Sequence, residues 1–476
     1  MTASSARRMA RTRPPPLGPA PTMRLPEPVR TRLGGGLRVA LVERRSVPVV
    51  NVQLLVLGGA AAVRPTQAGL ATFTADMIDE GAGERNALEI AAAFDLLGAA
   101  HYSSAGFDAS EVELNVLTPR LPQALEVLGD VVLSPTFPEA ELERVRHERM
   151  TRALQEVDDP RALATHALAR VLFGDGHPWG RPLLGTRDSL SGLSVADVRR
   201  FYQERYHPGC ATLLVVGDFE SNAMLTLLDQ AFGSWEARPV PAVEVPDPPA
   251  VEGTSVYVVD RPGSAQSEIR VGRVAVSRST GDYFPITVMN TVLGGSFTSR
   301  LNQRLREEKG YTYGAGCGFS MRRGPGPFVA QAAVHTPVTA EAVADFLGEI
   351  GRMAAEEVTP DELERARRYV ALRLPQRFET VADVTARLAE MALYDLPDDY
   401  FDVYVERVLA VTAAEVLEAA GRHLDVERMV VVVAGDRAAV EEPLIRLGIG
   451  PVEVLAAPEA PGDAPLPGGP ARTPRC

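Results

Sequence analysis

The residues LSVADVRRFYQERYHPGCATLLVVGD (193–218) are matched near the end of the chain by VTAAEVLEAAGRHLDVERMVVVVAGD (411–436). The offset is constant, because 412 − 194 and 436 − 218 both equal 218. In each copy Ser194 or Thr412 stands where a helix N-cap is expected, an acidic residue follows three positions later, and a β-branched run ends in Gly-Asp. The shared unit is therefore a helix, a turn and a buried strand.

A second pair of segments supports an internal duplication. FPEAELERVRHER (137–149) resembles VTPDELERARRYV (358–370), where Leu142 and Leu363 differ by 221 positions. Two independent matches at nearly the same offset indicate two homologous halves. Prolines crowd the region between them, a composition that favours an extended connector. We predict a disordered segment at 1–24, a first domain at 25–235, a Pro-rich linker at 236–253, a second domain at 254–456 and a disordered tail at 457–476.

The order of the strand-like and helix-like patterns predicts the fold class. Strands are expected at 47–59, 110–117, 211–218, 255–260, 327–334 and 428–436, and helices at 86–97, 120–132, 139–156, 340–355 and 360–374. These patterns arrive in groups and do not alternate strictly, which favours α+β over a doubly wound parallel sheet. Each half is expected to hold a mixed or antiparallel sheet packed with helices.

The composition excludes several classes of protein. The 49 basic and 62 acidic residues give a net charge of −13, which repels phosphate backbones, so nucleic acid is not an expected partner. Three distant cysteines form neither a disulfide framework nor a metal knuckle. No apolar run is long enough to span a membrane, and no apolar stretch follows the basic N-terminus, so cytoplasmic residence is expected. Met23 is an alternative start, which leaves open whether residues 1–22 are translated.

Generic motifs of catalytic sites are absent from the sequence. His147-Glu148 begins like His-Glu-x-x-His, but Thr151 stands where the second histidine is needed, so a solvated helix face is the better interpretation. GGG (34–36) and GAGCG (314–318) lack the spacing of phosphate-binding loops and are interpreted as turns. The remaining histidines without ligand-spaced partners are expected to be structural, namely His101, His166, His207, His335 and His423.

Four phrases together carry a much more specific signal. They are GLATFTADM (69–77), HPWGRPLLGT (177–186), YHPGCATLLVVGD (206–218) and LGGSFTSRLNQRLREEKGYTYG (293–314). In this order, within a duplicated half of about 220 residues, the chain resembles the pitrilysin and insulinase type of zinc peptidases, and in size the two-domain members similar to the mitochondrial processing peptidase. The resemblance covers nearly everything between residues 25 and 456. It implies a processing-peptidase-like metallohydrolase fold in each half.

The resemblance also shows where the sequence departs from active members. Their opening helix carries an inverted His-x-x-Glu-His zinc motif. On this sequence the two histidine ligands fall on Thr72 and Asp76, and the glutamate base falls on Ala75. The third ligand, a downstream glutamate, falls at or near Arg152, or at Glu148 or Glu156 if the register shifts. One carboxylate does not bind zinc tightly, so no metal and no cofactor are expected in this chain.

The second half keeps the family's other catalytic feature. Active members complete their site with an arginine and a tyrosine seven positions apart, and Arg306 and Tyr313 have this spacing within LREEKGYTY. The resemblance implies that the arginine clamps a peptide carbonyl and that the tyrosine hydroxyl donates to the oxyanion. Tyr311 is the alternative if the loop register shifts by two.

A chain with the Arg/Tyr half of a site and a degenerate zinc half suggests division of labour. The hypothesis is a non-zinc-binding subunit of a heterodimeric peptidase, which supplies Arg306 and Tyr313 to a zinc-bearing homologous partner. Unfolded peptides are the expected substrates, bound by strand addition. The alternatives are an inert structural subunit, as among the zinc-less core subunits of respiratory complex III, or an autonomous metallopeptidase that uses another metal through Asp76.

Overall fold

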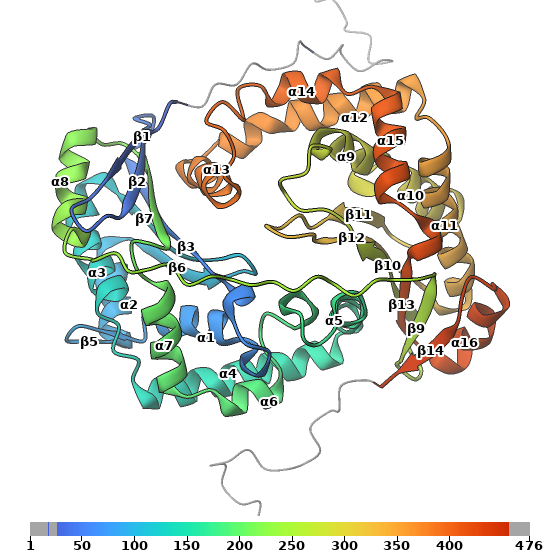
Figure 1. Ribbon diagram of the computed structural model, residues 1–476, viewed down its shortest axis with the longest axis horizontal. Helices are drawn as coiled ribbons and strands as arrows, with labels where there is room; N and C mark the ends of the chain where they lie inside the picture. Colours follow the sequence, from blue (N-terminus) through green and yellow to red (C-terminus); the bar gives the residue numbers. More distant parts are fainter. Residues whose placement is uncertain (1–17, 19–25, 457–476) are drawn as a thin grey trace, which may run out of the picture.

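The computed structural model describes residue 18 and residues 26–456. The first half forms a six-stranded sheet in the order β1-β2-β8-β3-β7-β6, in which only β2 and β8 pair in parallel (Figure 1). Its strands are β1 (Val29–Arg32), β2 (Arg38–Glu43), β3 (Val49–Leu57), β6 (Ala100–Ala105), β7 (Ala109–Leu117) and β8 (Ala211–Gly217). The mixed sheet agrees with the predicted α+β class.

The second half repeats this arrangement. Its six-stranded sheet has the order β14-β9-β13-β10-β12-β11, so β9, β13, β10, β12 and β11 take the places of β2, β8, β3, β7 and β6. The equivalent pair β9 and β13 is again parallel, and the following pairs are antiparallel. The strands are β9 (Ser255–Asp260), β10 (Gln266–Val274), β11 (Ala315–Phe319), β12 (Pro327–His335), β13 (Val430–Gly435) and β14 (Val452–Leu455). The predicted duplication is therefore confirmed by the topology.

Helices cover both sheets, and the predicted capping boxes are formed. The side chain of Ser194 accepts the backbone N–H of Asp197 at 3.2 Å, and Thr412 accepts that of Glu415 at 3.2 Å. The helices of the first half are α1 (Leu70–Met77), α2 (Ala87–Leu97), α3 (Leu121–Leu133), α4 (Glu139–Asp158), α5 (Pro160–Phe173), α6 (Arg187–Gly192), α7 (Val195–Arg205) and α8 (Ser221–Phe232). Those of the second half are α9 (Tyr283–Asn290), α10 (Arg300–Asn302), α11 (Thr339–Ala355), α12 (Pro360–Arg373), α13 (Val381–Tyr394), α14 (Tyr404–Ala410), α15 (Ala413–His423) and α16 (Arg437–Arg446).

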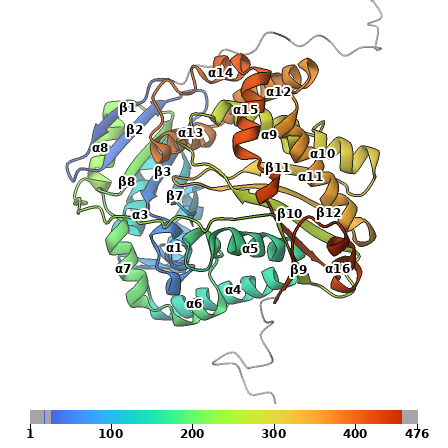
Figure 2. The same ribbon diagram turned by 45° about the vertical axis from the view of Figure 1, so that its right-hand side comes forward.

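Two equivalent helices cross between the halves. Helix α5 of the first half packs on β10 and β13 of the second sheet, and α13 of the second half packs on β3 and β8 of the first (Figure 2). They begin 381 − 160 = 221 positions apart, the offset already found for the helices before them. Because each half supplies a helix that covers the other half's sheet, the two halves bury apolar surface together and stabilise each other.

This reciprocal packing predicts a stability effect at α5. Leu163 is 3% exposed and lies among Val259, Val430 and Val432 of the second sheet. We expect Leu163→Ala to lower the free energy of unfolding by about 2 to 4 kcal/mol, because it removes buried methyl groups and leaves a cavity. Urea denaturation measures this. Leu96→Ala on α2 is the matched control, since Leu96 is 86% exposed, and a Leu163 variant as stable as that control contradicts the packing.

The Pro-rich connector and the two glycine-rich segments can also be compared with the sequence predictions. Residues 236–253 contain no helix or strand, and the connector is held in place by Arg205, whose Nη1 donates to the carbonyl of Pro241 at 2.9 Å. The segment 314–318 was predicted to be a turn, which is wrong, because Ala315–Phe319 pairs with β12 as edge strand β11. The segment 34–36 does form a turn, in which Gly36 N–H donates to the carbonyl of Leu33.

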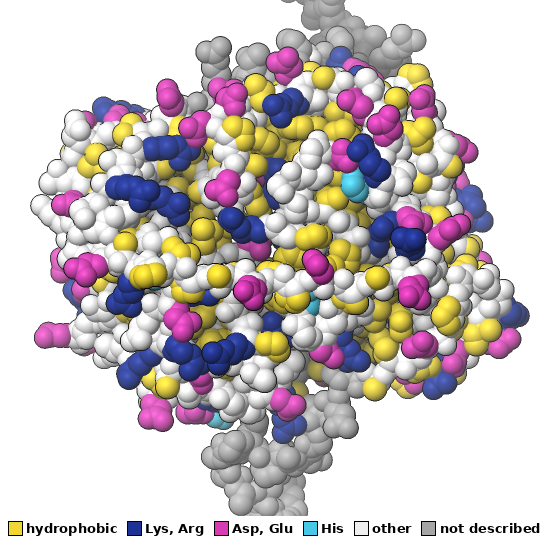
Figure 3. All heavy atoms as spheres, in the orientation of Figure 1, with side chains coloured by type: hydrophobic (Ala, Val, Ile, Leu, Met, Phe, Trp, Pro, Cys, Tyr) yellow, Lys and Arg dark blue, Asp and Glu magenta, His cyan; other side chains and the backbone are white. Residues whose placement is uncertain are grey.

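The predictions about the two ends of the chain and about membrane spans can be compared with the described residues only. The segments predicted to be disordered, 1–24 and 457–476, lie outside the described residues, apart from Gly18. Among the described residues, no helix has the length and apolar character needed to cross a bilayer. Basic and acidic side chains are interspersed over the face of the molecule shown in Figure 3.

Candidate functional site

The degenerate zinc motif lies on α1, whose start is fixed by two close backbone approaches. Gly69 precedes the helix with φ +88°, and a Cβ there would meet the carbonyl oxygen of Leu184 at 2.6 Å. Gly185 has φ +92°, and a Cβ there would meet the carbonyl oxygen of Ala68 at 2.7 Å. Only glycine permits this contact without strain. The loop 182–186 is thereby docked against the first turn of α1, with its carbonyl groups beside Thr72.

An arginine from α4 occupies the polar face of α1. Nη1 of Arg149 donates to Oδ2 of Asp76 at 2.5 Å, and its Nη2 donates to the hydroxyl of Thr72 and, at 3.0 Å, to the carbonyl of Leu184. The hydroxyl of Thr72 donates to the carbonyl of Leu183 at 2.7 Å. Arg149 is 2% exposed, and its burial lowers the pKa of the guanidinium, whereas Asp76 acts in the opposite direction. The motif positions form a closed ion-pair network.

These residues do not fit a zinc ion. Zinc requires three or four nitrogen, sulfur or carboxylate ligands, and here a guanidinium lies between Thr72 and Asp76 while the Ala75 methyl is buried in the base position. In the part of the chain that the structure describes, no cluster of three or more His, Cys, Asp or Glu side chains could hold a metal.

The sequence prediction for the third ligand position needs a correction. The prediction put Arg152 at or near this position, but Arg152 is exposed and Arg149, one helical turn earlier, is the arginine that enters the site. The two lie three positions apart on one helix, and Arg149 is the one whose guanidinium contacts Thr72 and Asp76. The loop contributes to this site, because the carbonyl of Leu184 accepts a hydrogen bond from Arg149 at 3.0 Å, a contact that no local pattern reveals.

The Arg306 segment of the second half is anchored on both sides. It forms a π-helical turn, Gln303–Glu308, directly after α10. Such turns are rare and occur frequently at functional sites. Arg300 pairs with Glu362 at 2.7 Å, and Arg304 pairs with Asp345 at 2.8 Å. Oδ1 of Asn302 accepts the backbone N–H of Ala315 at 3.0 Å, so the π-helical turn and the start of β11 are held together.

Arg306 and Tyr313 themselves face outward. The guanidinium of Arg306 lies 4.3 Å from the ring centre of Phe297, and the Phe297 side chain is mostly exposed. Tyr313 is 90% exposed, whereas Tyr311 packs against the core of the second half. Among the described residues, the side-chain contacts found for Arg149 are with Thr72, Asp76, Leu184 and Phe73, and those found for Arg306 are with Phe297 and Glu307, so no direct contact joins the two predicted half-sites.

The anchoring of the Arg306 segment predicts a pH-dependent effect. The Arg300 guanidinium holds the pKa of Glu362 well below its ordinary value of 4.5, at about 2. The ion pair therefore stabilises the protein above about pH 4.5, and this contribution is lost as the pH falls towards 2. We expect Glu362→Gln to cost about 1 to 2 kcal/mol at pH 7, a value discounted for solvent screening, with a smaller cost at pH 3.

Urea denaturation at several pH values measures this effect. Glu364→Gln is the matched control, because Glu364 pairs only with Arg368 on the surface of the same helix. If Glu362→Gln lowers the free energy of unfolding by the same amount at pH 3 as at pH 7, the assigned ion pair between Arg300 and Glu362 is contradicted.

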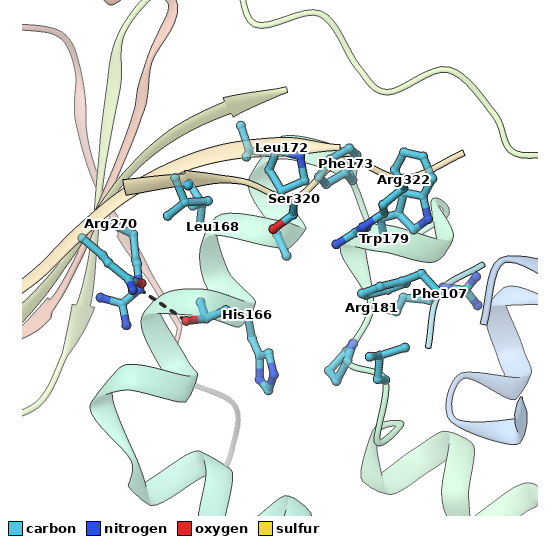
Figure 4. A pocket seen from close by; sticks show the side chains of 18 of the residues that line it. Phe107, His166, Leu168, Leu172, Phe173, Trp179, Arg181, Arg270, Ser320 and Arg322 are labelled. Atoms are coloured by element: carbon cyan, nitrogen blue, oxygen red, sulfur yellow. Dashed lines mark hydrogen bonds between the residues drawn. The ribbon is translucent and has the colours of Figure 1, made fainter. Parts of the chain in front are cut away.

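A cavity of about 640 Å³ lies between the two halves (Figure 4). Leu183 and Leu184, whose carbonyls bind Thr72 and Arg149, form part of its wall, and β11 forms another part. The cavity therefore lies between the loop that binds Thr72 and Arg149 and the strand that follows Tyr313. Its other main side chains, which the sequence analysis did not single out, are Phe107, Phe173, Trp179, Arg181, Arg270 and Arg322. Cys317 also lines it, and burial raises the pKa of its thiol, so it is no nucleophile.

Family models match both halves. Residues 38–187 match the insulinase (peptidase family M16) model, and residues 192–370 match the model of the peptidase M16 inactive domain. A relative from Streptomyces coelicolor, named an uncharacterized zinc protease, is 27% identical over 342 residues, which are 71% of this chain and 74% of the relative. Another of that description, from Mycobacterium leprae, is 28% identical over 60% of this chain, and the match spans 64% of the relative, less than two thirds of its length.

Solved structures share the fold. The peptidase M16 inactive domain from Pseudomonas fluorescens matches with a TM-score of 0.80 and 25% identity, covering 86% of this chain and 98% of that chain. Complex III2 from Candida albicans contains a chain that matches with a TM-score of 0.73 at 15% identity, covering 88% of this chain and 99% of that chain, and this shows likeness of fold alone. With the duplicated mixed sheets and the two family matches, the chain belongs to the M16 (insulinase) peptidase family.

Proposed function

We propose that this chain is the non-zinc-binding subunit of a heterodimeric peptidase, and that it supplies Arg306 and Tyr313 to the peptide-cleaving site of a zinc-bearing homologue. The observation that carries the proposal is Arg149, whose guanidinium occupies the polar face of α1 and pairs with Asp76 at 2.5 Å. A fixed internal cation at this place repels a divalent metal ion. The chain's own motif therefore does not serve as a zinc site.

The exposure of the Arg/Tyr pair supports its use by another chain. Tyr313 is 90% exposed, and Arg306 is partly exposed and stacked on Phe297. A tyrosine this exposed contributes little to the stability of the fold, so a role in contact with another molecule accounts for it better. Tyr311 is the weaker candidate because its ring packs against the core.

The chemistry of the pair suits the stabilisation of a peptide transition state. The Arg306 guanidinium offers a fork of N–H donors to the carbonyl oxygen of an extended peptide. The Tyr313 hydroxyl donates to the oxygen on which negative charge develops during attack on that carbonyl. The anchors at Glu362 and Asp345 hold the Arg306 segment before substrate binds, which lowers the reorganisation that the reaction requires.

The edges of both sheets support extended, unfolded peptides as substrates. Strand β6 pairs only with β7, and β11 pairs only with β12, so each presents one row of backbone N–H and C=O groups. A peptide in extended conformation can add to such an edge as a further strand. Strand β11 begins at Ala315, two residues after Tyr313, so a peptide on this edge passes close to the tyrosine.

Titration with a zinc-bearing homologue from the same genome tests the proposal. The homologue is held at a fixed concentration, this chain is added, and cleavage of an unstructured, internally quenched peptide is followed. We expect activity to rise and to saturate near equimolar amounts. Unchanged activity of the homologue at saturating chain, with no complex detected by size-exclusion chromatography, would contradict the proposal. A complex without any gain in cleavage would favour the inert structural subunit instead.

A further inference from the structure

Three arginines line the cavity between the halves. Arg181 comes from the loop after α5, Arg270 from β10 and Arg322 from the turn between β11 and β12. Figure 4 shows Trp179, Phe107, Arg181 and Arg322 gathered at one end of the cavity and Arg270 at the other. Glu156 is the acidic residue on the wall, and its carboxylate lies 3.7 Å from Nε2 of His166.

Two of these guanidinium groups form no ion pair with a carboxylate in the part of the chain that the structure describes. Arg270 pairs with Glu268 at 2.9 Å. Within residues 26–456, Arg181 donates to three backbone carbonyls, those of Val63, Arg64 and His177. Arg322 takes part in none of the ion pairs found among the described residues, although the carboxylate of Asp108 attracts it from a longer distance. The cavity therefore carries an excess of positive charge.

Arg322 and Trp179 also hold buried donors without acceptors. The guanidinium of Arg322 lies 3.8 Å from the ring centre of Phe107 and 4.9 Å from that of Trp179, and its Nη1 is buried without a hydrogen-bond partner. Trp179 is 1% exposed, and its indole Nε1 is also unpartnered. Burial lowers the pKa of Arg322 to about 10, which leaves it protonated at neutral pH. Unsatisfied buried donors are costly, so both groups favour a ligand rich in acceptor oxygens.

We propose that this cavity binds a carboxylate carried by a peptide, either a free C-terminus or an Asp or Glu side chain, with Arg322 as its main partner. Guanidinium groups pair with carboxylates in two parallel hydrogen bonds, and the apolar walls at Leu168, Leu172 and Phe173 accommodate a neighbouring side chain. The volume is in the range of a site for a few residues. This inference rests on the proposed function, because it assigns peptides with a carboxylate at the position that reaches Arg322 as the preferred substrate class.

Direct binding to the chain alone tests this inference without any cleavage. The binding of four fluorescein-labelled octapeptides is compared by fluorescence anisotropy. Their sequences are the same except at one internal position, which is Glu or Gln, and each of these two sequences is made with a free and with an amidated C-terminus. We expect the Gln amide to bind about 10- to 100-fold more weakly than the better carboxylate peptide. The Glu amide and the Gln free acid identify which carboxylate is bound. Equal affinity of all four peptides would overturn the inference.

A matched pair of variants assigns the effect to the cavity. We expect Arg322→Met to remove the preference for carboxylates, and Arg323→Met to keep it, because Arg323 donates outside the cavity to the carbonyl of Leu393 at 2.6 Å. The two variants lose the same charge at adjacent positions. If both variants lose the preference for carboxylate peptides, or if neither does, the assignment of the binding site to Arg322 is overturned.

A second measurement does not depend on the folding of Arg322→Met. The chain has two tryptophans, and in Trp235→Phe the remaining Trp179 reports on the cavity. We expect an unlabelled carboxylate peptide, and not the Gln amide, to change its fluorescence. Cleavage by the mixed complex that depends on Arg306 and Tyr313 but is equal for all four peptides would overturn this inference and leave the proposed function standing. If the chain binds carboxylate peptides but does not raise the activity of a zinc-bearing homologue, the proposed function is overturned instead.

Discussion

Replacing Arg306 by alanine and Tyr313 by phenylalanine together should lower kcat of the mixed complex by about 10²- to 10³-fold. This is the effect expected from the loss of preorganised donors to a developing oxyanion, and the two changes need not be additive. Because Tyr313 is 90% exposed, removal of its hydroxyl should leave folding and assembly intact. Initial rates at saturating peptide, together with the zinc content of the partner, provide the measurement.

A tyrosine two residues away provides the matched control. Tyr311→Phe removes the same hydroxyl from a ring that packs against the core of the second half, and kcat should stay within about threefold, since the ring keeps its packing and no transition-state donor is lost. A double variant at Arg306 and Tyr313 with full activity would contradict the proposed role. A loss at Tyr311 with none at Tyr313 would move the donor to Tyr311.

Replacing Arg149 by methionine should lower the free energy of unfolding by about 2 to 3 kcal/mol. Removal of one member of a buried ion pair leaves the other charge without a partner, and the usual cost is reduced here because the Asp76 side chain is 32% exposed. In the parent chain the Arg149 guanidinium lies 5.5 Å from the ring centre of Phe73. A methionine at this position retains apolar contact with that ring. Urea denaturation at pH 7 gives the value.

Two further variants separate the ion pair from packing. Arg149→Met combined with Asp76→Leu should recover most of the lost stability, because no buried charge then remains unpaired. Arg152→Met is the matched control for the change itself, since Arg152 lies one turn later and is exposed, and its effect should stay within about 0.5 kcal/mol. Equal costs at Arg149 and Arg152 would contradict the burial of Arg149 in the motif.

The duplication and the helix starts could be predicted from the sequence because their signals are local. The Ser194 and Thr412 capping boxes form as expected, and the β-branched runs after them become the buried strands β8 and β13. A constant offset between two segments requires no knowledge of long-range contacts. The predicted helix face at Thr72 and Asp76 also forms, within α1.

The remaining features depend on contacts between distant segments. Strand β11 was missed because its sequence, Ala-Gly-Cys-Gly-Phe, has low strand propensity, and pairing with β12 overrides it. Arg149 was missed because its partners lie far away in the sequence: Thr72 and Asp76 on α1, and Leu184 in a loop about 35 residues later. The cavity joins Arg181, Arg270 and Arg322 from three separate segments, and their charges are unremarkable in the sequence taken one at a time.

Zinc content and cleavage, measured on the same sample of the purified chain, test the central claim most directly. The chain is incubated with excess zinc, desalted, and assayed by elemental analysis and with an unstructured peptide, with and without a chelator. Because Arg149 occupies the motif between Thr72 and Asp76, we predict far less than one zinc per chain and no chelator-sensitive cleavage. One zinc per chain with robust, chelator-sensitive cleavage by this chain alone would contradict the account.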